Sequence, residues 1–399
     1  MTKVALISGE KILLMGLLLT PFTSLRNGFI LGPGEFLILI STLIALVTNG
    51  MVFRLDKRLK IFYRFWSAFL IISFLGVYVN NFLIEPSGIF KNMVFDIFSY
   101  MFILLTIVLI GHYAKSQKDF PETFFKKLFV YWGVIYVALF FISFFTRSIF
   151  GMPLRYHMYF SPLVENVHQA AMITCSMPFV LLYLGHTSPK FYLKALYIIG
   201  ALLFCYMAIS SNSTKAFLGV IVGVLIGLVH LVGYKPTGKG RYLFNTLTLL
   251  VSIASLVVLT FFYYDEIFFL AVQFFTENDG SGARETLYIN GFANGLNSPI
   301  IGHGPGSHAP YAHTFSDAHN TSLTIFLQAG LVGFIFFIWF NLSMLNKLSI
   351  HFALFAAMAS IGMYIIGGDI LRRLPIWVML IGIYYLAIYH PLKKIVREK

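Results

Sequence analysis

The stretch Ala216–Tyr234 reads AFLGVIVGVLIGLVHLVGY and is flanked by Lys215 and Lys235. It contains no carboxylate, ammonium or guanidinium group. A helix of about 20 apolar residues matches the roughly 30 Å hydrocarbon core of a bilayer. The stretch therefore predicts a membrane-spanning helix.

The rest of the chain has the same character. Of its 399 residues 58% are hydrophobic and 11% charged, and the mean hydropathy is +0.81. This composition excludes a soluble globular protein and indicates a polytopic membrane protein. Cys175 and Cys205 lie within apolar runs, where we expect them to be packing residues rather than a disulfide or zinc site. A window of about 20 residues predicts twelve spans: 5–24, 35–53, 62–84, 92–113, 127–146, 167–185, 191–210, 216–234, 242–264, 321–343, 350–368 and 374–390.

The net charge of +13 alone would also suit a nucleic-acid-binding protein, but the positions of the charges point elsewhere. If the N-terminus lies inside, 21 of the 29 Lys and Arg residues fall on the inner side. Cytoplasmic loops of membrane proteins collect these residues. The pattern predicts cytoplasmic termini and basic residues that face anionic lipid, without a nucleic-acid partner. Eight basic residues fall on the outer side: Arg26, Lys91, Arg147, Arg155, Lys215, Arg284, Arg372 and Arg373.

We expect one integral membrane domain over residues 1–399, all-α, with two notable outer loops. One covers about 146–166. The other, 265–320, lies between the ninth and tenth spans and is the longest connection. Long loops in compact proteins are usually functional or disordered. This loop has a predicted helix around Arg284–Asn294 and glycine turns at GHGPGSH, which favour an ordered functional loop.

Four of the outer basic residues invite specific readings. Lys215 opens a span, where the positive end of the helix dipole disfavours a cation unless an anion lies above it. Arg284 begins the predicted loop helix, where its guanidinium can grip phosphate oxygens or pair with Glu285 on the surface. Arg372, like its neighbour Arg373, can pair with Asp369.

The corner DAHN, Asp317–Asn320, leads directly into the tenth span. Asn320 or Thr321 can cap that helix. His319 has an imidazole suited to accepting a proton near neutral pH, and Asp317 or a loop carbonyl can fix its tautomer. The alternative is a capping or interfacial histidine. Gly330 and Gly333 are interpreted as close-packing sites between helices.

These motifs together resemble the O-antigen ligase and polymerase superfamily. HNTSLTIFLQAGLVG fits its His-Asn-x9-Gly-x-x-Gly pattern through His319, Asn320, Gly330 and Gly333. The long outer loop looks like the large periplasmic loop of that family, and SSNSTKAFLG is similar to its Ser-rich stretch, with Lys215 where arginine is usual. LVENVHQAAM resembles its Asn-Pro-type segment, with Val167 where proline is common.

The resemblance implies a GT-C-like fold in the bacterial inner membrane, with a periplasmic active site. It implies transfer of a glycan from undecaprenyl diphosphate to a sugar hydroxyl of lipid A–core, with inversion and without a metal or other cofactor. His319 would be the base, and Arg284 and Lys215 would hold the diphosphate. Residues expected to support or contact the substrate are Asn320, Asp317, Arg155, Asn166 and His168.

Other readings stay open. A polymerase would use the same donor but a lipid-linked nascent polysaccharide as acceptor, and TPFTSLRNGFILGPGE near the N-terminus resembles a polymerase form. A flippase or secondary transporter would place ionisable residues deep within its spans, whereas the charges here fall at span ends. His303, His308, His313 and His319 also raise the question of a metal site, but their spacing does not stack on one helical face.

Overall fold

The computed structural model describes residues 3–29, 31–80, 90–117, 119–157, 159–211, 213–233, 283–311 and 314–389. Long α-helices dominate these ranges. The α-helices are α1 (Lys3–Leu19), α2 (Pro33–Thr48), α3 (Lys60–Val77), α4 (Phe90–Ser116), α5 (Phe120–Ile142), α6 (Val167–Thr187), α7 (Phe191–Ser210), α8 (Thr214–Gly233), α11 (Ala283–Gly295), α12 (Thr321–Leu348), α13 (Phe352–Gly367) and α14 (Leu374–Ile388). Short 3₁₀ turns are η1 (Thr23–Arg26) and η2 (Lys57–Leu59).

The described strands form three antiparallel two-stranded ribbons in the connections. They pair β1 (Ser148–Ile149) with β2 (Met152–Pro153), β3 (Arg155–Tyr156) with β4 (Tyr159–Phe160), and β5 (Ala309–Tyr311) with β6 (Thr314–Ser316). The first two ribbons lie in the connection between α5 and α6, and the third precedes α12. The predicted outer loops thus contain ordered structure, and the predicted helix around Arg284–Asn294 is confirmed as α11.

Eleven of the twelve predicted spans coincide with a described helix, and the twelfth, 242–264, lies outside the described residues. The early part of the long loop, 265–282, also lies outside them. Seven described helices are long and apolar enough to cross a membrane: Lys57–Asn80, Met93–Ser116, Phe120–Ile142, His168–Thr187, Phe191–Ser210, Thr214–Leu231 and Thr321–Leu348. Helices α2, α13 and α14 are apolar but shorter. The all-α, multi-span architecture is therefore confirmed, whereas the count of twelve stays a prediction.

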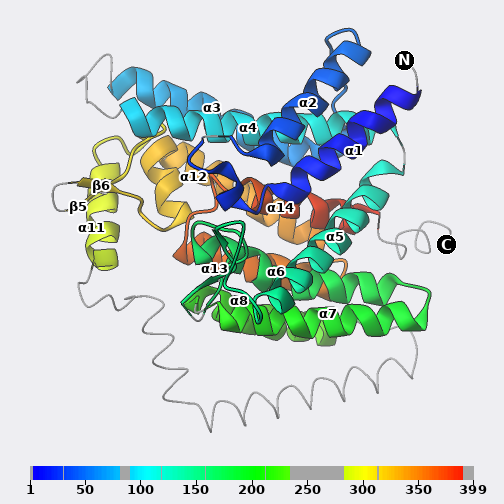
Figure 1. Cartoon of the computed structure of the whole chain (residues 1–399). Helices are drawn as coiled ribbons and strands as arrows, with labels where there is room; N and C mark the ends of the chain where they lie inside the picture. Colours follow the sequence, from blue (N-terminus) through cyan, green and yellow to red (C-terminus); the bar gives the residue numbers. More distant parts are fainter. Residues whose placement is uncertain are drawn as a thin grey trace.

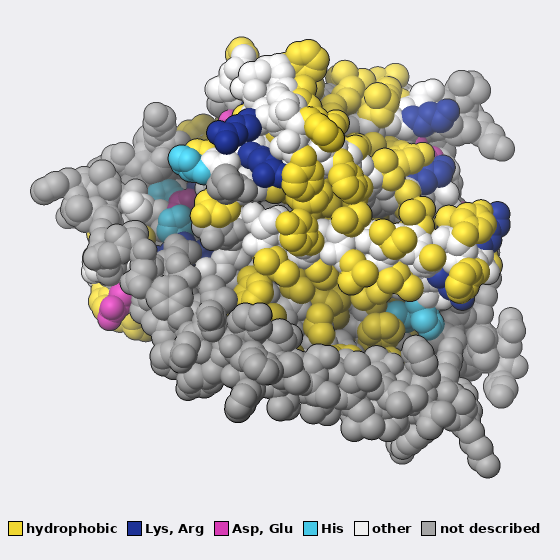
Figure 2. Space-filling model, turned by 60° about the horizontal axis from the view of Figure 1, so that its bottom comes forward, with side chains coloured by type: hydrophobic (Ala, Val, Ile, Leu, Met, Phe, Trp, Pro, Cys, Tyr) yellow, Lys and Arg dark blue, Asp and Glu magenta, His cyan; other side chains and the backbone are white. Residues whose placement is uncertain are grey.

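The surface of the molecule agrees with a lipid environment. Hydrophobic side chains cover the middle of the face shown in Figure 2, and Lys and Arg lie towards its two sides. On α2, Phe36, Ile40, Leu43 and Val47 are exposed, at helical spacings of three to four residues. Such an exposed apolar stripe is stable against acyl chains and unfavourable in water.

Helix α14 occupies the centre of the bundle (Figure 1). Almost all of its residues are buried, which is the pattern of a helix surrounded on every side. The Trp377 ring stacks on Phe65 and meets Trp66 edge to face, with ring centroids 5.6 and 4.7 Å apart. The Tyr385 hydroxyl donates to an oxygen of Asp56 at 2.9 Å. The last described helix is thus bonded to residues near the start of α3.

Helix α11 and the β5–β6 ribbon lie together at one end of the bundle, beside α12 (Figure 1). The connection between them, including Gly302 and Gly304, inserts between α3 and α12. A Cβ on Gly304 would lie 2.8 Å from the Ser73 oxygen, and one on Gly302 would lie 2.5 Å from the Ala329 nitrogen. The glycines of GHGPGSH therefore permit the loop to touch the backbones of two helices.

Helix α12 is interrupted at Gly330, whose φ of 60° and ψ of −161° are not helical. The Leu331 and Val332 N–H groups donate to Pro299 and Ile300 oxygens at 2.8 and 3.2 Å. On the other side of the break, the Leu327 and Gln328 oxygens accept from His303 and Gly304 N–H groups at 2.7 and 3.0 Å. The interpretation of Gly330 as a helix–helix packing site is wrong, because its close neighbour is the loop backbone at Ile300.

Candidate active site at the mouth of α12

The predicted cap of α12 is Asn320. Its side-chain oxygen accepts the Leu323 N–H at 3.0 Å, and its backbone is extended, as an N-cap requires. His319 immediately before it is exposed and has a φ of 49°, in the left-handed region. Few non-glycine residues adopt this conformation, although histidine is among those enriched there. The left-handed backbone of His319 turns the chain between the preceding loop and α12.

The corner is also tied to the end of α13. The Asn320 amide donates to the Ile366 oxygen at 2.6 Å, and the Thr321 hydroxyl donates to the Gly368 oxygen at 2.9 Å. The same hydroxyl accepts the Ile370 N–H at 3.1 Å. Three hydrogen bonds thus fix the start of α12 against the connection that leads from α13 to α14.

Asp317 forms the centre of a charged network beside this corner. One of its oxygens pairs with Nδ1 of buried His308 at 3.1 Å, and the other accepts a short hydrogen bond from Arg372. Arg372 also reaches Asp96 of α4 at 3.2 Å and Asp369 at 3.7 Å. The predicted pairing of Arg372 with Asp369 is confirmed, but it is the longest of the three, and Arg373 does not share it.

Burial opposes ionisation of Asp317, but the hydrogen bond from His308 and the charge of Arg372 outweigh it and hold its pKa well below the ordinary value. Burial dominates at Asp369 instead and raises the pKa of that carboxyl. The neighbouring carboxylates overcome the effect of burial on Arg372 and raise its pKa. The network therefore keeps a charged Asp317–Arg372 pair two residues from His319.

Asp96 continues the network into the bundle. Its Oδ2 accepts the Gly306 N–H and the Gln328 amide, each at 2.9 Å, and Tyr100 donates to the Gln328 oxygen at 2.8 Å. Since buried charge without partners is costly, these bonds stabilise the Asp96 carboxylate and hold the loop 299–308 at Gly306. The position of the His319 corner thus depends on α4, α12 and the α13–α14 connection together.

Lys215 lies at the start of α8 and is buried, with 4% of its surface exposed. Ser213, two residues earlier, is 2.9 Å from the Tyr364 hydroxyl of α13 and 3.4 Å from Nδ1 of His168. Tyr364 is half a turn before Ile366, which binds Asn320. The structure therefore gathers the first turns of α6, α8 and α12 around the C-terminal end of α13.

Arg284 lies in the first turn of α11 and is also buried, with 9% of its surface exposed. One turn later, Leu287 belongs to a small apolar cluster with Ala318, the residue before His319, and with Leu327. The first turn of α11 thus packs beside the His319 corner. The first turns of α8 and α11, which contain Lys215 and Arg284, are thus each linked to this corner through intervening residues.

The remaining predicted support residues, Asn166, His168 and Arg155, have different surroundings. Asn166 caps α6 by accepting the His168 N–H at 2.9 Å, and His168 reaches Ser213 as described. Arg155 lies in β3, where its guanidinium stacks on Phe144 at 4.6 Å and donates to the Ser143 hydroxyl at 3.2 Å. These contacts connect the loop between α5 and α6 to the end of α5, and they suit a structural role for Arg155.

This geometry can be set beside known proteins. Residues 199–338, from α7 to α12, match a family model described as O-antigen ligase. This segment is similar to O-antigen ligases. The predicted resemblance is confirmed over a segment that contains Lys215, Arg284, His319 and the two glycines of α12. No curated protein matches the chain. With its apolar helices, the chain is a multi-pass membrane protein, and its residues 199–338 are similar to O-antigen ligases.

Sequence reasoning missed two features of the matched segment and its surroundings. One is the pairing of His308 with Asp317. The other is the convergence of Asp96 and Arg372 from helices far apart in the chain. The sequence shows that Asp96, Asp317 and Arg372 carry opposite charges near predicted span ends. Charge alone does not show which of these residues form ion pairs.

Proposed function

We propose that this protein transfers a glycan as a unit from undecaprenyl diphosphate to a sugar hydroxyl of lipid A–core, in lipopolysaccharide synthesis. The reaction takes place at the periplasmic face of a bacterial inner membrane, with both termini in the cytoplasm. The observation that supports the proposal is the exposed His319 at the mouth of α12, within the segment that matches the O-antigen ligase model. The same segment has two buried cations, Lys215 and Arg284, in the first turns of α8 and α11.

In the proposed step, His319 removes the proton of the acceptor hydroxyl, whose oxygen attacks the anomeric carbon. The bond from that carbon to the diphosphate oxygen breaks, and its electron pair leaves with the diphosphate. Arg284 and Lys215 stabilise the charge that develops on the leaving group. Direct displacement inverts the anomeric configuration, and the cations take the place that a metal ion has in other transferases.

Asp317 acts as a positioning residue in this scheme. Its bonds to His308 and Arg372 hold the loop end, and Asn320 holds the helix end, so that the imidazole stands between two fixed points. Preorganisation of this kind lowers the reorganisation needed in the transition state. The exposed imidazole remains accessible to a large hydroxyl-bearing acceptor.

A polymerase with a lipid-linked glycan as acceptor is the second candidate. The observation that favours it is the polymerase-like segment near the N-terminus, since Arg26 of that segment lines the same cavity as Arg372. A flippase or transporter is less well supported, because the charged network, apart from Asp96 of α4, lies in the connections next to helix ends.

The test is deletion of the gene, followed by complementation with wild-type protein, His319→Ala and His319→Gln. The ligase proposal expects full-length glycan that is not attached to core; a single repeat on the core instead supports the polymerase. Both variants should insert at wild-type levels and lose transfer by about 10²–10⁴-fold, as expected for removal of a general base. Transfer by His319→Ala at the wild-type rate would refute the assignment of the base.

A further inference from the structure

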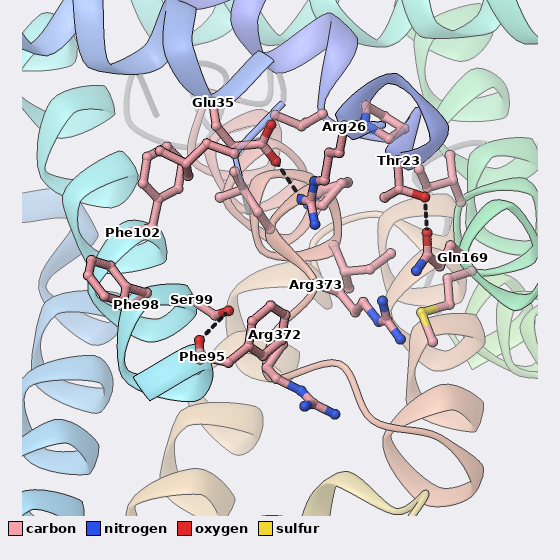
Figure 3. A pocket seen from close by; sticks show the side chains of 18 of the residues that line it. Thr23, Arg26, Glu35, Phe95, Phe98, Ser99, Phe102, Gln169, Arg372 and Arg373 are labelled. Atoms are coloured by element: carbon pink, nitrogen blue, oxygen red, sulfur yellow. Dashed lines mark hydrogen bonds and ion pairs between the residues drawn. The ribbon is translucent and has the colours of Figure 1, made fainter. Parts of the chain in front are cut away.

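A cavity of about 360 Å³ lies beside the candidate site, where η1, α2, α4, α6 and the α13–α14 connection meet. Arg26, Arg372 and Arg373 line it, together with Glu35. Phe98 and Phe102 of α4 form one side of the cavity, and Arg373 and Gln169 lie on the other (Figure 3). One wall is therefore aromatic and the other carries guanidinium groups.

Two of these arginines already have carboxylate partners. Arg26 binds Glu35 at 2.5 Å, and the second oxygen of Glu35 accepts the Gly32 N–H at 3.0 Å. Arg372 is shared among Asp96, Asp317 and Asp369, which lie behind it and do not line the cavity. Both are therefore fixed in place by bonds within the protein.

Arg373 differs from its neighbours. Within the described ranges, no hydrogen bond or ion pair of its guanidinium is found, and the nearby charge of Asp369 is not within ion-pair distance. Burial and the adjacent Arg372 lower the pKa of Arg373. A cationic group in such surroundings is stabilised by an anion that can accept its N–H donors, and its planar fork matches phosphate oxygens.

The aromatic wall continues onto the surface of the molecule. Phe95 and Phe98 of α4 line the cavity and are also 43% and 62% exposed. A ligand with an anionic head and an apolar tail can thus place its head at Arg373 and its tail along α4. A free sugar phosphate would leave this wall without a partner.

The cavity is connected to the His319 corner through one side chain, because Arg372 both lines the cavity and binds Asp317. Lys215 and Arg284 are not among its lining residues. We propose that this cavity binds the phosphate-bearing head of the second lipid-linked substrate, the acceptor, with Arg373 as its anchor. This inference rests on the proposed function, in which two lipid-borne molecules must meet at one imidazole.

The test uses the full-length protein in phosphatidylcholine nanodiscs that contain phosphatidic acid, a lipid phosphate monoester, with inorganic diphosphate as a separate soluble probe. Binding is measured by native mass spectrometry for wild type, Arg373→Gln, Ser99→Glu and Arg147→Gln. Ser99 lines the cavity, so a carboxylate there should repel the ligand without removal of an arginine. Arg147 is an exposed arginine outside the cavity lining and serves as the matched control.

We expect Arg373→Gln, which removes a charge-assisted bond, and Ser99→Glu, which adds a repelling carboxylate, each to weaken phosphatidic acid binding by roughly tenfold or more. Arg147→Gln should bind as wild type does. Equal affinity in wild type, Arg373→Gln and Ser99→Glu would overturn the inference. So would an equal loss in Arg147→Gln, which indicates general surface attraction, or a loss confined to inorganic diphosphate, which indicates a site for a free anion.

Transfer assays separate this inference from the proposed function. Arg373→Gln should raise the KM for the acceptor and leave that for the donor unchanged. Should His319→Ala retain transfer while Arg373→Gln loses lipid binding, the catalytic proposal fails and the lipid-phosphate site stands. A rise in the donor KM alone would contradict the assignment of the cavity to the acceptor.

Discussion

Replacement of Gly330 by alanine tests the broken helix most directly. Its backbone conformation, φ 60° and ψ −161°, belongs to a region that only glycine adopts readily, and forcing another residue there costs about 1–3 kcal/mol. An added Cβ would lie 2.3 Å from both the carbonyl carbon and the oxygen of Ile300, a contact that backbone cannot absorb without moving.

That movement would break two loop bonds, from the Leu331 and Val332 N–H groups to Pro299 and Ile300, each worth about 0.5–1.5 kcal/mol. Together with the backbone strain, Gly330→Ala should destabilise the protein by about 2–6 kcal/mol. It should also reduce glycan transfer, because the displaced loop leads through His308 to Asp317.

The assay is thermal unfolding of the purified protein in detergent, alongside glycan transfer in membranes. Gly362→Ala in α13 is the control, because a Cβ there meets nothing within 4 Å and alanine favours a helix. We expect a clearly lower unfolding temperature for Gly330→Ala and an equal or higher one for Gly362→Ala. Indistinguishable unfolding of the two variants would refute the break in α12 and the docking of the loop against it.

Three further predictions concern the corner itself. Asn320→Ala should cost about 1 kcal/mol of stability through loss of the cap, whereas Asn320→Ser should keep the cap and lose only the bond to Ile366. Equal unfolding temperatures for the alanine and serine variants would contradict the capping role. Because the folded pKa of Asp317 lies below its unfolded value near 4, its carboxylate stabilises the fold above about pH 4, and this contribution disappears as pH falls through the folded pKa. Asp317→Asn should therefore unfold at lower temperature at neutral pH but lose less stability on acidification, and a parallel pH profile for wild type and variant would count against the network. Lys215→Arg should retain transfer with an unchanged KM for the donor, while Lys215→Ala should raise the donor KM at least about tenfold. A similar donor KM for wild type and both variants would exclude Lys215 from the donor site.

Much of the fold follows from apolar length alone. Each helix from α1 to α8 and from α12 to α14 coincides with a window long enough to be recognised, because the bilayer requires one continuous apolar segment per span. The N-cap at Asn320 was also accessible, since capping depends on neighbours within one turn. Local rules therefore predicted local structure.

What escaped prediction depends on pairing between distant segments. The sequence supports Arg372 near Asp369, three residues away, but its shorter contacts are with Asp317 and Asp96, which only the folded bundle brings near. The sequence around Gly330 predicts a small packing residue in an apolar helix. The interruption of α12 depends on the contact of Gly330 with the loop at Ile300, which the sequence does not show. The cavity at Arg373 likewise requires five segments to meet.

The burial of α14 has a consequence for biogenesis. Its aromatic rings fill the space among α3, α5, α6 and α12, and its Tyr384 and Tyr385 hydroxyls satisfy groups at the start of α3. All of those helices leave the ribosome before it, so during synthesis they surround an unfilled centre that lipid or other chains must occupy. Packing of the bundle is thus completed late, and a ribosome stalled before residue 374 would carry a protein inserted in the bilayer but not yet packed.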